Sequence, residues 1–327
     1  MADASSHARP VNAAAAAALR RELGAVETDA HGLADRLPDL MLEAERIAAT
    51  VSHGIHGRRR AGPGETFWQF RQYGQNDPAQ MIDWRRSASS DQLYVREREW
   101  EAAHTIWLWP DLSASMRFKS HLSTTTKRDR VLVLTLAAAE LLVRGGERVA
   151  LIGLSQPTAT RHAARKLAEA IARAAGTPGL EASLPPAAQL SRFCGTILIS
   201  DFLDPIDDIR ARLEALAGHG IQGHILQVLD PAEETLPYSG RTEFVGLEGG
   251  ERWIAERAET LREAYIEKLQ AHRAQLREIA TRLGWSFLLH HTDRPAAEPL
   301  LSLVVHMQGK ELGAGLAPSP DQMESRA

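Results

Sequence analysis

The stretch TIWLWPDLSASM, residues 105–116, decides how the rest of the chain is interpreted. A short apolar run ends at Asp111, and hydroxyl side chains follow at Ser113 and Ser115. In an open α/β sheet, ligands bind in the crevice beyond the carboxyl ends of the strands. Residues 105–110 are therefore predicted to form a strand that ends in one carboxylate and two hydroxyls, at a place where a binding site is expected.

These three side chains favour a particular class of ion. Carboxylate and hydroxyl oxygens are hard ligands that suit Mg²⁺ or Mn²⁺, whereas Zn²⁺ would require His or Cys and Ca²⁺ more carboxylates. One carboxylate leaves most of the ion's charge uncompensated, so an open coordination position would attract an acidic side chain from another molecule. The residues favour a docking site over a catalytic one. The alternative is that Asp111 caps the helix or turn that follows while the serines bond local backbone.

The composition is typical of a globular protein. The 327 residues can form one large or two medium domains, and 44% of them are hydrophobic. A net charge of −4 lacks the basic excess of a nucleic-acid-binding domain, and the single cysteine, Cys194, predicts a buried thiol in a reducing compartment. The alanine run 13–18 is too short to span a membrane and is followed by Arg20. A cytoplasmic protein without a membrane span is predicted.

Five segments are expected along the chain. They are a disordered start at 1–10, helices at 11–52 broken near Gly32 and Pro38, an aromatic and arginine-rich segment at 53–103, an α/β domain at 104–312 and a flexible tail at 313–327.

The α/β domain is inferred from apolar strands that alternate with amphipathic helices. The strands are predicted at 105–110, 148–154, 195–201, 223–230, 242–247 and 285–290, and the helices at 127–144, 162–175, 206–218, 254–282 and 297–306. Such alternation predicts a doubly wound, mainly parallel sheet with helices on both faces.

A second acidic residue is expected beside the first. Asp201 ends the strand predicted at 195–201 in the same way that Asp111 ends its own strand. Because the carboxyl ends of parallel strands meet at one edge of a sheet, both acids are predicted at that edge, which strengthens the prediction of a metal site. Two acids that merely belong to solvated loops are the alternative.

The segment 53–103 mixes arginines, aromatic residues and turn residues without a regular period. Basic residues interleaved with aromatics can bind single-stranded nucleic acid. The intervening Asp and Glu residues argue against that function, and we expect the arginines to pair with these acids and stack on the aromatic rings. The segment is thus predicted to be a small irregular or β insert that binds no nucleic acid.

The motif Asp111-x-Ser113-x-Ser115 with a sheet-edge Asp201 resembles the metal-ion-dependent adhesion site of von Willebrand factor A domains. The resemblance implies that these residues hold Mg²⁺, directly or through water, and that an acidic side chain of a partner fills the last position. It also implies a threonine ligand from another loop. Thr160 or Thr158 is the candidate, although Thr160 is equally suited to cap the helix predicted at 162–175.

The preceding segment is similar to the signature of the bacterial family catalogued as domain of unknown function fifty-eight. The similarity extends over roughly residues 50–230 and includes Arg71, Tyr73, Asp77, Asp83, Trp84 and Arg85, which are candidates for partner binding or for a structural role. It departs from the signature at Asn76 and Gln80. The resemblance implies a non-enzymatic adaptor or co-chaperone that works with a MoxR-type AAA+ ATPase on an unknown client protein.

Other functions are open to the same residues. A Mg²⁺-dependent hydrolase would use the acids at strand ends, with Asp204 and Asp230 beside those already named. His290 and His291 are adjacent on a predicted strand, so one is expected in the core and the other in solvent. The apolar stripe of the long helix predicted at 254–282 is expected to pack on the sheet, with partner binding as the alternative.

Overall fold

The computed structural model describes residues 32–53, 69–74, 82–88, 92–97, 104–177, 180–188, 190–191, 194–218, 220–247 and 251–314. Two compact units are distinguished, a small one at Ile55–Ala103 and a main one that comprises Met1–Gly54 and His104–Ala327. The predictions for 1–10 and 11–31, and that for the tail beyond 314, lie outside the described residues.

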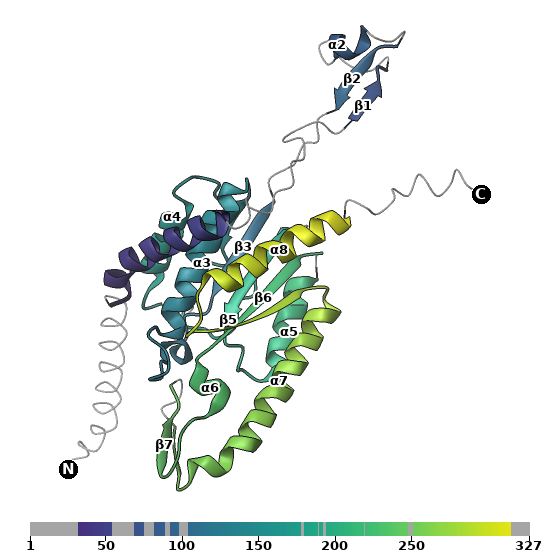
Figure 1. Ribbon diagram of the computed structural model, residues 1–327. Helices are drawn as coiled ribbons and strands as arrows, with labels where there is room; N and C mark the ends of the chain where they lie inside the picture. Colours follow the sequence, from purple (N-terminus) through teal and green to yellow (C-terminus); the bar gives the residue numbers. More distant parts are fainter. Residues whose placement is uncertain are drawn as a thin grey trace, which may run out of the picture. The chain divides into compact units, whose positions relative to one another are not determined.

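The main unit contains a five-stranded parallel sheet in the order β4-β3-β5-β6-β9 (Figure 1). The strands are β3 (Thr105–Pro110), β4 (Arg148–Leu151), β5 (Gly195–Ser200), β6 (Gln222–Leu229) and β9 (Ser286–His291). The chain runs from β3 outward to β4 and then returns to β5 on the other side of β3. The order therefore reverses between β3 and β5, where open α/β sheets bind ligands.

Helices cover both faces of this sheet, as the alternating pattern predicts (Figure 1). α3 (Lys127–Arg144) and α8 (Ala297–Ala314) pack on one face, and α4 (Ala163–Ala174) packs against α3. α5 (Ile206–Ala217) and α7 (Arg262–Arg282) cover the other face. None of the helices in the described residues is both long and apolar enough to cross a membrane.

The helix at 32–53 continues through Pro38, so the break predicted there is wrong. One face of the helix is buried, with apolar residues at Leu33, Leu37, Leu40, Ala44, Ala48 and Val51. Arg36 also forms an ion pair with Asp129 of α3. The charges of Glu43 and Glu45 act on Arg130 and Glu140 of α3, so the helix runs beside α3. The burial of its apolar face offsets the hydrogen bond that a proline removes from a helix interior.

The segment before α7 is the main error in the predicted elements. Instead of a helix from 254, β7 (Thr242–Val245) and β8 (Arg252–Ala255) pair as an antiparallel hairpin, and a 3₁₀ turn, η3 (Ala258–Leu261), precedes α7. Trp253 stacks on Phe244 across the hairpin, a cross-strand contact that stabilises paired strands. Tertiary pairing overrides the helical pattern here.

Smaller differences concern the ends of two elements and one additional short helix. β4 ends at Leu151 instead of 154 because the chain turns at Gly153, whose φ is +75°. α8 extends to Ala314, beyond the predicted end at 306. A short helix, α6 (Pro231–Thr235), was not predicted, although Asp230, Pro231 and Glu233 form the capping box and N1 proline that begin a helix.

The small unit contains a two-stranded antiparallel sheet, β1 (Gln69–Gln72) with β2 (Tyr94–Glu97), and a single helical turn, α2 (Trp84–Ser87). Asp83 caps α2 by accepting hydrogen bonds from the backbone N–H groups of Arg85 and Arg86 at 3.1 and 3.0 Å. Its backbone N–H donates to the carbonyl oxygen of Tyr94. Asp83 therefore has a structural role within this unit.

Candidate functional site

Asp111 is fixed just beyond the end of β3. Its backbone N–H still donates to the carbonyl oxygen of Ile199 on β5. Its carboxylate accepts from the backbone N–H of Ser113 at 2.8 Å and from the Ser200 hydroxyl at 2.6 Å. The side chain is fully buried. The first acid of the predicted site is thus held in one orientation by two short hydrogen bonds.

The remaining predicted oxygens lie next to it. The hydroxyl oxygens of Ser113 and Ser115 are 3.1 Å apart, and Ser115 donates to Oδ2 of Asp201 at 3.2 Å. Asp201 follows β5, and the next residue, Phe202, has a positive φ of 49° that turns the chain away from the sheet. The structure therefore brings Asp111, Ser113, Ser115 and Asp201 together at the carboxyl edge. We call this group the strand-end cluster.

A lysine that the sequence reasoning missed completes this cluster. Lys127 is the first residue of α3 and its side chain is 1% exposed. Its Nζ lies 2.8 Å from Oδ2 of Asp201 and 2.6 Å from Oε1 of Glu233. A lysine in the first turn of a helix faces the positive end of the helix dipole, which disfavours a cation there. That unfavourable position was the available sequence signal.

Glu233 connects the cluster to the loop after β6. One of its oxygens contacts Lys127, and the other accepts from the backbone N–H of Asp230 at 2.8 Å. Asp230 in turn accepts from the backbone N–H groups of Ser120 and Ala232, each at 2.9 Å. The loops after β3, β5 and β6 are therefore joined by hydrogen bonds and ion pairs among buried side chains.

Burial and charge together shift the pKa values of this group. Burial raises the pKa of Asp111 to about 7, and the neighbouring charge of Asp201 adds to that effect, while hydrogen bonds from Ser200 and Ser113 oppose it. Burial opposes the charge of Lys127, but Asp201 and Glu233 outweigh it and raise the pKa of the ammonium. Burial also raises the pKa of Glu233, with Lys127 acting against it. Lys127 thus stays charged while the acids around it are desolvated.

The donor set fits a hard divalent ion of the Mg²⁺ or Mn²⁺ class. Two carboxylates and two hydroxyls are oxygen ligands of the type these ions prefer. Within the described residues no group of three or more His, Cys, Asp or Glu side chains is placed to hold a metal. The two serines would therefore have to supply part of the coordination, and the metal role of all four residues stays a prediction.

Thr158 and Thr160 lie away from the strand-end cluster, so neither is placed to act as a ligand there. Thr158 forms an antiparallel bridge with Val149 of β4, and Val149 pairs with Ile106 near the start of β3. Asp111 is five residues further along β3, about 16 Å at the usual rise of a strand. Thr160 lies beyond Thr158 in the opposite direction. The threonine ligand implied by the family resemblance is not supplied from this loop.

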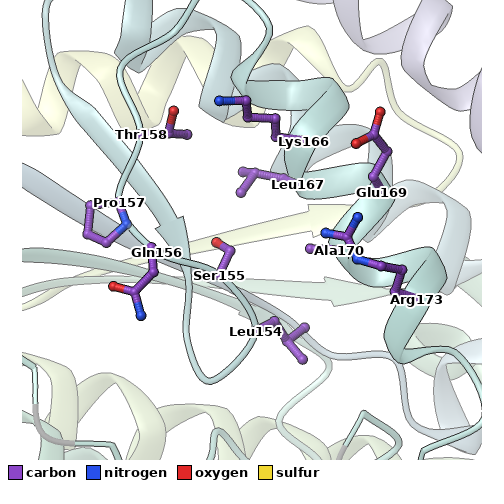
Figure 2. Close-up of a pocket in the computed structure, with 10 residues that line it drawn as sticks. All are labelled: Leu154, Ser155, Gln156, Pro157, Thr158, Lys166, Leu167, Glu169, Ala170 and Arg173. Atoms are coloured by element: carbon purple, nitrogen blue, oxygen red, sulfur yellow. The ribbon is translucent and has the colours of Figure 1, made fainter.

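Thr158 instead lines a surface pocket of about 540 Å³ beside β4. Residues 154–158 form one side, and α4 supplies the other with Lys166, Glu169 and Arg173 (Figure 2). All three of these charged side chains are exposed. We call this hollow the α4 pocket; it shares no lining residue with the strand-end cluster.

The other predicted residues are placed as follows. His290 is buried, whereas His291 is half-buried and lies 3.3 Å from Glu234, which fits the expected opposite orientations. Asp204 accepts from Ser183 at 2.7 Å. Trp84 is 65% exposed in the small unit. Cys194 is buried and free, as expected. Asp77 lies outside the described residues.

The fold and this site define an α/β protein with a buried polar cluster at the reversal point of a parallel sheet. The chain belongs to the family described as Protein of unknown function DUF58, which matches residues 69–275. Uncharacterized proteins of Mycobacterium bovis and Mycobacterium tuberculosis are 28% identical to it over 275 residues, covering 80% of this chain and 86% of theirs.

Among the solved structures that match, two are similar to the chain at lower sequence identity. The conserved hypothetical protein BatB from Bacteroides thetaiotaomicron is 16% identical and covers 63% of this chain and 100% of its own, with a TM-score of 0.33. An aerotolerance-related membrane protein from Bacteroides fragilis, with multiple mutations to serines, is 17% identical and covers 61% and 96%, with a TM-score of 0.36.

Proposed function

We propose that the chain is a non-enzymatic protein-binding adaptor whose strand-end cluster binds Mg²⁺, or Mn²⁺, and docks an acidic side chain of a partner. The observation that supports this most is the continuous contact from Asp111 through Ser113 and Ser115 to Asp201 at the carboxyl edge. On this proposal the main unit is a von Willebrand factor A-like domain, and the metal would supply the positive charge that a partner's carboxylate requires.

The residues have separate tasks in this proposal. Asp111 would bind the ion with an oxygen already oriented by Ser113 and Ser200. Ser113 and Ser115 would contribute neutral oxygens, and Asp201 would contact the ion directly or through water. Because both hydroxyls are uncharged, an ion that reaches Asp201 through water would be bound directly by one carboxylate only, and it would keep positive charge that attracts a carboxylate from outside.

The partner is proposed from the family resemblance. A MoxR-type AAA+ ATPase in the cytoplasm would bind the chain, which would link it to a client protein. Trp84 and the adjacent Arg85 of the small unit are candidates for a second contact because both side chains are exposed.

A Mg²⁺-dependent hydrolase is the alternative, and the contacts favour it less. General-base catalysis requires a carboxylate or imidazole within reach of a water molecule. Asp230 is fully buried and accepts from two backbone N–H groups. Asp204 is engaged by Ser183, and Asp201 is paired with Lys127. Each acid that would act as a base therefore already has a structural partner.

The proposal is tested by capture of a purified MoxR-type ATPase from the organism that encodes the chain on the immobilised full chain. Capture is expected in millimolar Mg²⁺, and we expect it to be lost in EDTA and in Asp111→Ala. Asp208→Ala, which changes an acid in the first turn of α5 outside the cluster, serves as the matched control and should still capture. Equal capture by all proteins in EDTA would contradict the proposal.

A further inference from the structure

The ammonium of Lys127 lies beside a carboxylate that the proposed function assigns to the metal ion. The ammonium is buried and contacts Oδ2 of Asp201, the same oxygen that accepts from Ser115. A carboxylate oxygen with two donors already directed at it has little capacity left for a further cation. A metal ion in the strand-end cluster would therefore compete with the ammonium of Lys127 for the negative charge of Asp201.

The contacts of Lys127 do not resemble those of an ordinary surface ion pair. Exposed pairs of this kind contribute little because water screens them, whereas both partners here are withdrawn from solvent: the side chain of Asp201 is 3% exposed and that of Glu233 is 16% exposed. Removing one member of a buried pair leaves an uncompensated charge. The lysine thus supplies one positive charge against these two acids when no other cation is bound.

We propose that Lys127 is the resident cation of the strand-end cluster: it holds Asp201 and Glu233 in place without metal and competes with a divalent ion for Asp201. The inference rests on the proposed function, since it concerns the same site. It adds that the affinity for metal is lowered by a residue that is no ligand, and that a metal bound at Oδ2 of Asp201 must displace the ammonium.

Glu233 gives the displaced ammonium a second place to bind. Its Oε1 lies 2.6 Å from Nζ, so Lys127 keeps a carboxylate partner when the contact to Asp201 weakens. Because the other oxygen of Glu233 is fixed in the capping box of α6, this partner does not move away. Exchange between ammonium and metal at Asp201 then requires only a small movement of the lysine side chain.

The test measures binding of Mn²⁺ by electron paramagnetic resonance together with thermal unfolding in EDTA and in Mn²⁺. Lys127→Met removes the ammonium and retains much of the apolar length of the side chain. It is expected to bind Mn²⁺ at least tenfold more tightly than the wild type, to unfold at a lower temperature in EDTA and to be restored by Mn²⁺. The matched control is Lys166→Met at the exposed α4 pocket, which should behave as the wild type.

Two further variants guard against loss of folding. Lys127→Gln keeps a hydrogen-bond donor without the charge and should show the same gain in affinity. Lys127→Met combined with Asp201→Asn removes both charges, should fold more stably than Lys127→Met in EDTA and should lose the gain. A purely structural lysine would lower stability without raising metal affinity, and that result would overturn the inference.

The outcomes separate this inference from the proposed function. If the wild type binds Mn²⁺ and Asp111→Ala does not, while Lys127→Met and Lys127→Gln bind no more tightly than the wild type, the metal site stands and the role of Lys127 is refuted. If none of these proteins binds Mn²⁺ at the cluster, both are refuted. Tighter binding in both lysine variants, lost in the double variant, supports the inference.

Discussion

Two regions of the main unit each contain a lysine beside the loops of the sheet, and the two lysines differ in burial. In the strand-end cluster, Lys127 is 1% exposed and contacts two carboxylates. At the α4 pocket, Lys166 is exposed. The first region lies where loops from three neighbouring parallel strands meet, so each loop supplies charges for the others. The second lies beside an edge strand, where only one loop and one helix surround the charged side chains, which are therefore exposed to water.

The comparison therefore predicts that charge at the cluster matters for stability and charge at the pocket does not. Asp201→Ala removes one of the two carboxylates that contact buried Lys127 and should lower the free energy of unfolding by about 3 kcal/mol, the low end for a broken buried pair, because Glu233 still contacts the ammonium. Urea unfolding measures this. Glu169→Ala at the pocket removes the exposed ion pair with Arg165 and should cost less than about 1 kcal/mol. Similar losses in both variants would break the comparison.

His290 extends the comparison to a buried base. It lies in the same sheet as the strand-end cluster, and no carboxylate contacts it among the described residues. Burial lowers its pKa to about 3, and the charges of Arg130 and His291 add to the effect. An unfolded histidine binds a proton near pH 6.5. The folded chain resists protonation there, so its free energy of unfolding should fall as the pH drops from 6.5 towards 3 and should be insensitive to this group above 6.5.

The expected loss by pH 5 is about 1–2 kcal/mol from this residue alone. Urea unfolding of the wild type and His290→Gln at pH 7.5 and pH 5 measures it. The variant should lose less stability than the wild type over that interval. An identical loss in the two proteins would show that His290 is not kept neutral by its surroundings.

Removing a single hydroxyl tests whether the serines of the strand-end cluster contribute to stability and to metal binding. Ser115→Ala removes one hydrogen bond to Asp201 and should lower the free energy of unfolding by about 1 kcal/mol. It should also weaken Mn²⁺ binding at least tenfold in isothermal titration calorimetry. Thr160→Ala, which changes an exposed hydroxyl remote from Asp111, should leave Mn²⁺ binding unchanged. Weaker Mn²⁺ binding in Thr160→Ala would show that Thr160 is a ligand, against its position in the structure.

The smallest effect is expected at the α4 pocket itself. Lys166→Met should change the free energy of unfolding by no more than about 0.5 kcal/mol, as is usual for exposed positions. Urea unfolding beside the wild type measures it. A loss as large as that in Asp201→Ala would mean that the pocket closes around Lys166 in solution.

The sequence predicts the sheet well because its strands are continuous apolar runs that end at polar residues. Asp111 and Asp201 each follow such a run, and parallel strands place their carboxyl ends at one edge whatever the intervening loops do. The two serines follow from the same reasoning because they are only a few residues away. Local pattern and register together determine this part of the site.

The rest of the site depends on contacts between residues far apart in the chain. Lys127 meets Glu233 across 106 positions, and nothing local to either residue indicates the other. The hairpin at β7 and β8 is a local structure and differs in this respect: its strands are short, and the pairing and the stacking of Trp253 on Phe244 override a helical pattern in the sequence. Thr160 was misplaced because the antiparallel bridge at Thr158, which directs the loop away from Asp111, has no sequence pattern of its own.

The most direct test of the metal-assisted docking site is a crystal structure of the full chain grown in millimolar Mn²⁺, with anomalous diffraction used to locate the ion. We predict one anomalous peak bordered by Asp111, Ser113, Ser115 and Asp201, with Nζ of Lys127 farther from Asp201 than the 2.8 Å found here. The absence of a peak from that position, with Lys127 still paired to Asp201, would contradict the account.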